Sequence, residues 1–309
     1  MLGLCCQYMC EKLKKNGSKE LINILNERHL QFGRYKKGDY SKSDIHDVWL
    51  NNTTELLSVL KRIKSEGYSV MRISSGLLPL YDLAEADLKS DQQVLDKLKE
   101  IGYFVKENKM RVTQHPDQFC VLSSETPSVV DNAVVILEHH AWIFDQMGLD
   151  RTPFYAINVH GGKKGNSKQL IEVINTRLSD SAKNRLTLEN DERGYSVKDL
   201  YKVFESTNVP TVMDTHHHTF LPDGLEMEEA LNLAISTWGT VKPLTHLSNT
   251  TPGLEEGNFT EKRKHSDYVT YIPDCQLQAN NSGRIDIEME FKMKNLAIEK
   301  AVKDFGLLL

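Results

Sequence analysis

Histidine and carboxylate residues recur along the chain, each at or just beyond the end of a short apolar run. Six residues have this placement: His115, His160, Glu189, Asp214, His246 and Glu290. Imidazole nitrogen combined with carboxylate oxygen suits Mn, Zn or Fe better than Mg or Ca, which prefer oxygen alone. Six ligands are too many for one tetrahedral ion, so the pattern predicts two or three divalent ions. We expect Mn as the native ion, with Zn and Fe as alternatives, and Glu189 as a bridge between two ions.

Each of these residues alone has a simpler explanation. A histidine at a strand end is commonly a hydrogen-bonded residue, and an Asp or Glu there is commonly the N-cap of the next helix. Six such groups beside apolar strands are different, because buried unpaired charge is costly and shared cations compensate all of them at once. Water bound to such ions becomes a nucleophile near neutral pH, so the cluster predicts metal-assisted hydrolysis. Within the cluster we expect Glu189, Glu290 and His246 to be catalytic.

Eight short apolar runs would position these groups. We predict strands over residues 2–6, 68–73, 110–113, 154–159, 185–188, 209–213, 241–247 and 284–290, with helical patterns between them. Strands that alternate with helices pair in parallel, and eight such units close into a (β/α)8 TIM barrel, an α/β fold. An open doubly wound sheet is the alternative, but no G-x-G-x-x-G motif follows the first strand. The prediction is one domain over residues 1–309, with every strand end at one face, where barrel active sites form.

The composition limits the kinds of partner that the protein can bind and the cell compartment in which we expect it. The 309 residues carry a formal net charge of −5, so any contact with nucleic acid must come from a local basic patch. The chain has no apolar run of about 18 residues, and no charged segment precedes an apolar one at the N-terminus, so we expect a cytoplasmic protein without a membrane span.

The five cysteines are an odd number without a paired framework. Cys5, Cys6 and Cys10 have a C-C-x3-C spacing that could hold a metal, but no second Cys/His pair follows at zinc-site spacing. Reduced thiols are the favoured interpretation.

The motifs around the predicted ligands, taken in order, resemble the UV damage endonuclease family, which is similar in fold to endonuclease IV, a three-metal DNA repair barrel. They are His115-Pro116-x-Gln118, Asn158-x-His160-Gly161-Gly162, Leu188-Glu189-Asn190-Asp191, Asp214-x-x-His217, His246-Leu247-Ser248, His265-x-Asp267-Tyr268 and Glu290-x-Lys292-x-Lys294. In addition, Arg72-Ile73-Ser74-Ser75 with Leu78-Pro79 resembles the second-strand segment of the family. The resemblance spans most of the chain. It implies ATP-independent incision of double-stranded DNA immediately 5′ to UV photoproducts (pyrimidine dimers and 6-4 photoproducts) and some other lesions, leaving a 3′-hydroxyl and a 5′-phosphate. It therefore implies a DNA repair hydrolase that needs no nucleotide cofactor and is nucleoid-associated when it acts on DNA.

The resemblance also assigns individual residues. It implies a full set of metal ligands: His115, His160, Glu189, Asp214, His217, His246, His265 and Glu290. His216 and His218 flank His217, and we expect at least one of the three not to be a ligand. For His265 the alternative is a solvated loop histidine. Gln118 and Phe119 match a Gln–aromatic pair that in the family wedges into the duplex at the lesion; Phe119 replaces the more familiar Tyr, and its alternative role is that of a core aromatic.

Two positions depart from the family pattern. The family often has Tyr after the first-strand glycine, but here Gly3 is followed by Leu4, and Gln7 and Tyr8 are the candidate substitutes. The family can also carry a modified lysine two residues before the strand-seven histidine. Leu244 has that position here, and Lys242, two residues further back, would point to the same face of the strand.

Loop residues near the predicted mouth are candidates for DNA contact. Lys163, Lys164, Lys262, Arg263 and Lys264 are expected to neutralise phosphates, with ordinary solvated loop charge as the alternative. We expect the protein to act as a monomer. Two other functions compete: a metal-dependent sugar isomerase or epimerase on the same kind of barrel, and a non-catalytic barrel that binds metal or a partner protein. The large number of histidines and the basic loops favour the nuclease.

Overall fold

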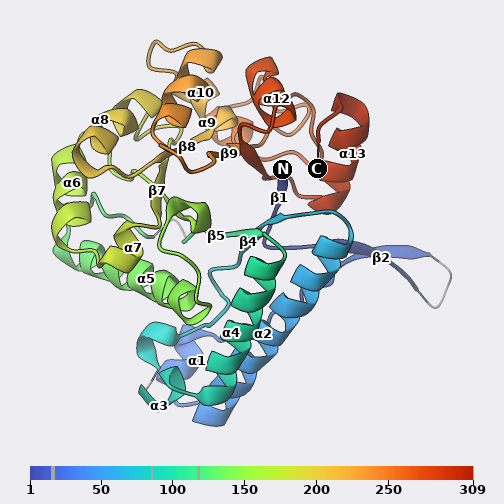
Figure 1. The fold of residues 1–309 in the computed structure, drawn as a ribbon, viewed down its shortest axis with the longest axis vertical. Helices are drawn as coiled ribbons and strands as arrows, with labels where there is room; N and C mark the ends of the chain where they lie inside the picture. Colours follow the sequence, from blue (N-terminus) through green and yellow to red (C-terminus); the bar gives the residue numbers. More distant parts are fainter. Residues whose placement is uncertain (15–17, 85, 117–118, 309) are drawn as a thin grey trace.

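The computed structural model describes residues 1–14, 18–84, 86–116 and 119–308 of the chain. Its centre is a closed barrel of parallel strands, as predicted (Figure 1). The strands are β1 (Leu2–Cys5), β4 (Val70–Ile73), β5 (Arg111–Gln114), β6 (Ile157–His160), β7 (Leu186–Glu189), β8 (Thr211–Asp214), β9 (Leu244–Leu247) and β10 (Asp286–Met289). Each falls on one of the predicted apolar runs. β1 pairs with both β4 and β10, which closes the sheet.

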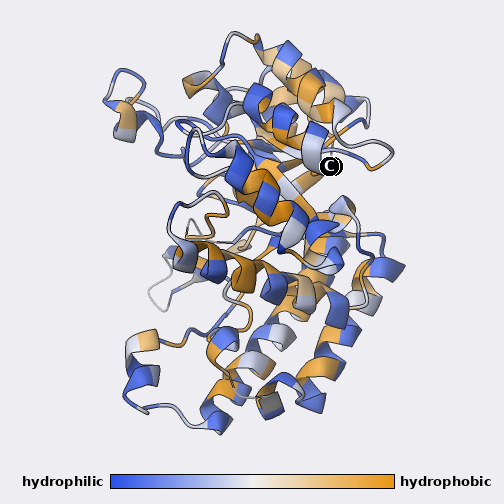
Figure 2. Cartoon of the chain, turned by 90° about the vertical axis from the view of Figure 1, so that its left-hand side faces the viewer, coloured by the Kyte–Doolittle hydropathy of each residue, from blue (hydrophilic) through white to orange (hydrophobic). Residues whose placement is uncertain are grey.

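Helices surround the barrel, and most of them form the crossover between consecutive parallel strands (Figure 1). The longer ones are α2 (Lys42–Ser65), α4 (Gln92–Glu107), α5 (Pro127–Gln146), α6 (Ser167–Thr176), α8 (Val197–Thr207), α10 (Met227–Ser236), α12 (Asp274–Asn281) and α13 (Asn295–Phe305). Short helical segments lie in the loops: α1 (Phe32–Lys36), η1 (Tyr81–Leu83), α3 (Ala86–Lys89), η2 (Pro153–Tyr155), α7 (Asp180–Lys183), α9 (Thr215–Phe220) and α11 (Phe259–Lys262). The helices carry apolar and hydrophilic residues at intervals along their length, as Figure 2 shows. This periodicity gives each one a face to bury against the sheet.

The helix α2 illustrates the pattern. Its residues Leu56, Leu57, Leu60 and Ile63 recur at helical spacing on one face, and all four are buried. Ser41 begins the helix with a capping box to Asp44, which satisfies backbone N–H groups of the first turn. The neighbouring helices α4 and α5 approach closely: a Cβ on Gly102 would collide with the backbone oxygen of Met147, directly after α5, so that position accepts only glycine.

A hairpin of β2 (Met9–Leu13) and β3 (Lys19–Asn23) projects from the barrel and was not predicted (Figure 1). Its strands lack the apolar–polar alternation of a half-buried strand, because β3 begins with three exposed residues. The amide of Asn295 anchors its base by accepting a hydrogen bond from the backbone N–H of Met9 at 2.7 Å and donating one to the Met9 carbonyl at 3.0 Å. This pairing joins residues from the two ends of the chain, which no local pattern reveals.

Two apolar regions stabilise the fold. The larger one fills the space between the strands and the helices. The smaller one groups Ala156, Val212 and Leu244 with Trp238. The other buried positions of the strands include many polar and charged residues. Among the described residues, no helix is both long and apolar enough to cross a membrane.

Candidate metal centre

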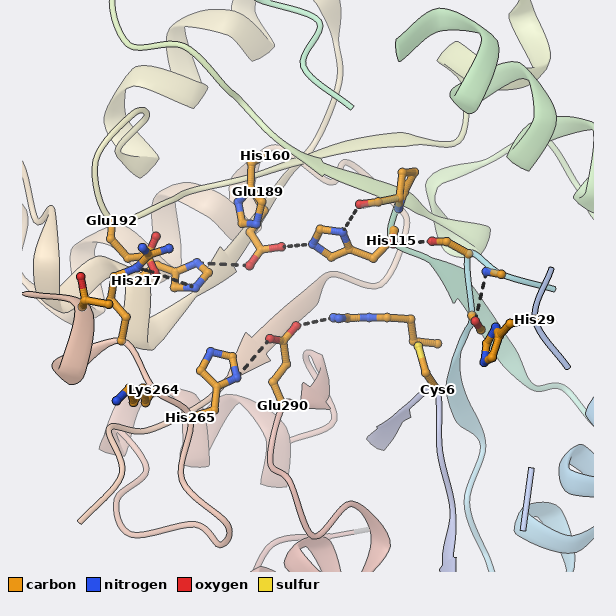
Figure 3. A pocket seen from close by; sticks show the side chains of 17 residues that line it. Cys6, His29, His115, His160, Glu189, Glu192, His217, Lys264, His265 and Glu290 are labelled. Atoms are coloured by element: carbon orange, nitrogen blue, oxygen red, sulfur yellow. Dashed lines mark hydrogen bonds and ion pairs between the residues drawn. The ribbon is translucent and has the colours of Figure 1, made fainter. Parts of the chain in front are cut away.

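Six of the eight predicted ligands line a single mouth at the carboxyl ends of the strands, with a volume of about 800 Å³ (Figure 3). His160, Glu189 and Asp214 are the last residues of β6, β7 and β8. His115 follows β5 directly, and Glu290 follows β10. Parallel strands in a closed barrel end at the same face, so residues far apart in the sequence converge there.

Glu189 is the hub of this mouth. Its Oε2 atom lies 3.1 Å from His115 Nε2 and 3.1 Å from His246 Nδ1, and its Oε1 atom lies 3.3 Å from His217 Nδ1. The described residues form three groups whose ligand atoms lie within 4.8 Å of one another: His115 with His160 and Glu189, Glu189 with Asp214 and His217, and Glu189 with His246 and Glu290. Glu189 belongs to all three groups, as a bridging carboxylate would.

The donor set fits divalent cations. Glu189 Oε1, Asp214 Oδ2 and His160 Nδ1 are buried and form no hydrogen bond within the described part of the chain. Leaving buried polar atoms unsatisfied costs free energy, and cations bound by the ligand groups to which these residues belong would remove that cost. Burial would raise the pKa of Glu189, but His246 and His160 hold it well below its ordinary value. The carboxylate is therefore ionised and available as a ligand.

Asp214 serves two purposes. Its Oδ1 atom accepts hydrogen bonds from the backbone N–H groups of His216 at 2.7 Å and His217 at 2.9 Å, so it is the N-cap of α9. Its Oδ2 atom forms no hydrogen bond in the described part of the chain, and Asp214 belongs to a ligand group with Glu189 and His217. The N-cap and the ligand interpretations of this residue are thus compatible, since each uses a different oxygen.

The three adjacent histidines have different surroundings. His217 turns toward Glu189, whereas His218 Nε2 lies 3.1 Å from the carbonyl oxygen of Leu225, away from the ligand groups. The ring of His216 packs against Phe220 at 5.1 Å between centroids. Burial lowers the pKa of His217, but Asp214 and Glu189 raise it well above its ordinary value. Of the three, His217 is placed as the ligand.

His265 reaches the same mouth from the loop after β9, opposite Glu290 (Figure 3). Its Nδ1 atom lies 3.7 Å from Glu290 Oε2, and its side chain is 30% exposed. It is therefore a residue of the mouth, in contrast to the alternative of a histidine in open solvent. Six of the eight residues expected as ligands line this cavity, and the other two, Asp214 and His246, belong to ligand groups with Glu189; the ligation itself stays a prediction.

Comparisons with known proteins agree with this geometry. A family model described as UV-endonuclease UvdE matches residues 2–307. The chain belongs to this family. A UV DNA damage endonuclease from Nostoc sp. is 34% identical over 304 residues, covering 93% of this chain and 90% of the relative. One from Deinococcus radiodurans is 33% identical over 260 residues, covering 82% and 81%. The crystal structure of SacUVDE shares the fold, with a TM-score of 0.79, 24% identity and 99% coverage of both chains.

Family membership makes the protein a DNA-cleaving endonuclease, and so a hydrolase. This decides between the competing functions, because neither a sugar isomerase nor a non-catalytic barrel belongs to this family. Cysteines play no part in the ligand groups that the described residues form. The five thiols are free, which agrees with the prediction of reduced cysteines.

The structure answers the two open questions about departures from the family pattern. Lys242 lies before β9, at the opposite end of the barrel, where its Nζ atom is 2.7 Å from Asp286. It therefore cannot stand in for a modified lysine at the metal centre. Leu4 and Tyr8 are buried in the apolar core and cannot probe DNA, whereas Gln7 is exposed.

Of the two predicted wedge residues in this endonuclease, Gln118 lies outside the described residues. Phe119 is 73% exposed, so its alternative role as a core aromatic is wrong. It lines a shallow cavity of about 420 Å³ with Val135 and Ile136 of α5. An exposed ring on this surface is free to stack on a base.

The predicted phosphate contacts divide into two groups. Arg263 and Lys264 line the mouth. Lys262 lines a neighbouring cavity, and Lys163 and Lys164 are exposed on the loop after β6, where Lys163 pairs with Glu125 at 2.5 Å. Of the five, Arg263 and Lys264 therefore lie in the mouth with the predicted ligands.

Three charged residues of the endonuclease site were missed by sequence reasoning. Glu192 lies 3.7 Å from His217 Nε2 and 2.5 Å from Arg263 Nε. Arg72 lines the mouth and pairs with Glu288 as well as with the predicted ligand Glu290. Glu288 precedes Glu290 by two residues and so shares its face of the strand. That spacing was the signal in the sequence that could have revealed it.

Proposed function

We propose that this enzyme incises DNA immediately 5′ to UV photoproducts and other distorting lesions, leaving a 3′-hydroxyl and a 5′-phosphate. The observation that carries the proposal is the set of three ligand groups joined at Glu189, beside a mouth whose lining includes Arg72, Arg263 and Lys264. Such a centre needs no nucleotide cofactor. We infer that the enzyme acts as a monomer on nucleoid DNA in the cytoplasm.

We assign two or three divalent ions to the centre, with Mn as the preferred ion and Zn or Fe as alternatives. The expected ligands are His115, His160, Glu189, Asp214, His217, His246, His265 and Glu290. When bound, the ions neutralise the charge of the scissile phosphate and lower the pKa of bound water to near neutrality. Because Glu189 contributes to every group, it would hold the ions at the short spacing that a shared phosphate requires.

The rim residues would bind and orient the DNA strand. Arg263 is fixed by Glu192 on one side, and its guanidinium lies 5.5 Å from the ring centroid of Phe259. Arg193 lies over the same ring at 4.0 Å. These contacts hold two guanidinium groups near the mouth, where they would bind successive phosphates. Replacing Arg263 by Ala should reduce the slope of log affinity against log salt by about 1, measured with an undamaged duplex.

The preference for damaged DNA would come from the free energy that is needed to unstack its bases. A photoproduct is already poorly stacked, so separating it from its neighbours costs less than separating normal base pairs. Gln118 and Phe119 are assigned to fill the resulting gap, as an inserted side chain does in other proteins that bend DNA. The exposure of Phe119 supports this role.

The decisive experiment is incision of a duplex oligonucleotide that contains one defined photodimer. Purified enzyme should cut it at one position when Mn²⁺ is present, and chelator should abolish the cut. Mapping the ends tests the predicted 3′-hydroxyl and 5′-phosphate. Cleavage that persists in chelator, or equal cleavage of an undamaged duplex, would contradict the proposal.

A further inference from the structure

Three acidic side chains lie one above another inside the barrel. Two of them belong to β10, and the third belongs to the residue that follows it. Asp286, Glu288 and Glu290 alternate with apolar neighbours, and side chains two residues apart point to the same face of a strand. Asp286 is level with Leu244 of β9, and Glu288 is level with His246. Glu290 reaches the mouth as a predicted ligand. Glu288 therefore lies one layer beneath the metal centre.

Glu288 is fully buried, and both of its oxygens have partners. Its Oε2 atom accepts a hydrogen bond from Arg72 Nε at 2.7 Å, lies 2.5 Å from Arg72 Nη2, and lies 3.2 Å from His246 Nε2. Its Oε1 atom accepts a hydrogen bond from the hydroxyl of Thr113. This carboxylate has no contact with the open mouth, so its function must be exerted through its neighbours.

The neighbour that matters is His246, which is also fully buried. Its Nδ1 atom lies 3.1 Å from Glu189 Oε2 and 3.4 Å from Glu290 Oε1, so this nitrogen faces the metal ligands. Its Nε2 atom faces Glu288. A neutral imidazole carries one proton, and a metal can bind only the nitrogen that lacks it. The environment of Nε2 thus decides whether Nδ1 is available.

Arg72 Nη2 approaches both ring nitrogens, at 3.0 Å from Nε2 and 3.4 Å from Nδ1, and is a candidate hydrogen donor to either. However, Nη2 carries only two hydrogens. Two carboxylate oxygens lie closer to it, Glu288 Oε2 at 2.5 Å and Glu290 Oε1 at 2.6 Å. Both hydrogens are thereby used, and Nε2 is left to donate its own hydrogen to Glu288.

We propose that Glu288 is a positioning residue of the metal centre, which accepts the Nε2 hydrogen of His246 and so presents Nδ1 as a ligand. Arg72 balances the charge of Glu288 and links it to Glu290. A carboxylate behind a ligating imidazole fixes the tautomer and the ring orientation and makes the nitrogen a better ligand. The inference rests on the proposed metal centre, and its test measures metal binding separately from incision.

The test compares Mn²⁺ affinity in the full-length wild-type protein and in Glu288→Ala and Glu288→Gln, by calorimetry after chelator treatment. Removing such a carboxylate typically weakens metal binding about 10- to 100-fold. We expect the larger loss for Ala and the smaller loss for Gln, whose amide oxygen still accepts a hydrogen bond. Co²⁺ loaded into each variant should also show an altered visible absorption spectrum, because the geometry of a ligand changes.

The matched control is Asp286→Asn, on the same strand and face but at the closed end. It neutralises an equally buried carboxylate, so it reproduces the loss of folding free energy that such a substitution causes, without changing a contact of His246. Its folded protein should bind Mn²⁺ like the wild type. His246→Ala supplies the second control: in that background Glu288→Gln should cause no further loss, because both residues act through one ligand.

Three results would overturn the inference. They are wild-type Mn²⁺ affinity in a folded Glu288 variant, equal losses in Glu288→Gln and Asp286→Asn, and fully additive losses in the double variant with His246→Ala. If Glu288→Ala does not fold, the isosteric Glu288→Gln decides the question. Absence of Mn²⁺ binding in the wild type would instead contradict the proposed metal centre itself.

Discussion

Two buried carboxylates at opposite ends of the barrel interior, Asp286 and Glu189, have very different charged partners. Asp286 lies at the amino-terminal end of β10 and has three cationic partners: Arg111 at 3.1 Å, Lys242 at 2.7 Å and the N-terminal amine at 3.2 Å. Glu189, at the carboxyl-terminal end of β7, is surrounded by histidines and the amide of Asn158. No lysine or arginine lies within ion-pair distance of Glu189 among the described residues.

The difference separates a structural end from a functional end. At the closed end, the chain itself supplies the positive charge, so nothing from outside is needed. At the open end, the chain supplies imidazole groups that can lose a proton, and it leaves carboxylate oxygens without hydrogen bonds. This arrangement can bind a cation. The predictions below test this contrast, beginning with the largest expected effect.

Removing the charge of Glu189 should abolish incision and leave the fold intact. Glu189→Gln keeps the shape of the side chain but removes the ligand shared by all three groups. We expect no cleavage of a photodimer duplex and an unchanged circular dichroism spectrum. Normal incision by this variant would mean that the ligand assignment is wrong.

The same type of change at Asp286 should have the opposite outcome. Asp286→Asn leaves Arg111, which is fully buried, without its carboxylate. Breaking a buried ion pair in this way costs about 3–5 kcal/mol of folding free energy. Urea unfolding should show this loss, while the folded fraction still binds Mn²⁺ and cuts damaged DNA. A loss of metal affinity without a loss of stability would erase the distinction between the two ends.

A metal ion should raise the free energy of unfolding only by binding at the open end of the barrel, where Glu189 lies. Mn²⁺ at 100 times its dissociation constant should add about 2.7 kcal/mol to the free energy of unfolding. We expect the same gain in Asp286→Asn and little gain in Glu189→Gln, which thermal unfolding with and without the ion would measure. An equal gain in all three proteins would place the bound ion elsewhere.

Metal affinity should also rise with pH, because protons compete with the ions for the imidazoles. Burial lowers the pKa of His246, but Glu189 outweighs it and raises the pKa from 6.5 to about 10. The metal-free protein therefore keeps the stability from this charged pair in full below about pH 6.5 and loses it as the pH rises through about 10. Metal binding instead requires the deprotonated ring, so calorimetry in buffers of different ionisation enthalpy should detect proton release at neutral pH. Binding that is independent of pH would contradict ligation by His246.

The smallest effect concerns lesion choice at the rim of the open end. Phe119→Ala removes a ring whose stacking on a base is worth about 1–3 kcal/mol. It should reduce the preference for damaged over undamaged duplex, while affinity for undamaged duplex changes little. Competition binding with matched oligonucleotides measures this preference, and an unchanged ratio would exclude the wedge role.

The sequence by itself determined the barrel and brought together most of the residues that could hold a metal ion. Apolar runs and helical periodicity are local properties, and they placed all eight strands because each strand is buried along its length. The ends of parallel strands in a barrel must meet, so residue types at those ends were enough to bring Glu189 and its histidines together.

Only the tertiary structure decided which groups are partners. The contact of Glu288 with Arg72 joins residues 216 positions apart, and the placement of Lys242 beside Asp286 depends on where β9 begins. The exposure of Phe119 and the anchoring of the β2–β3 hairpin by Asn295 are likewise set by packing. Hydrophobic periodicity specifies which face of an element is buried, but the pairing of charges depends on distances that exist only after the barrel has closed.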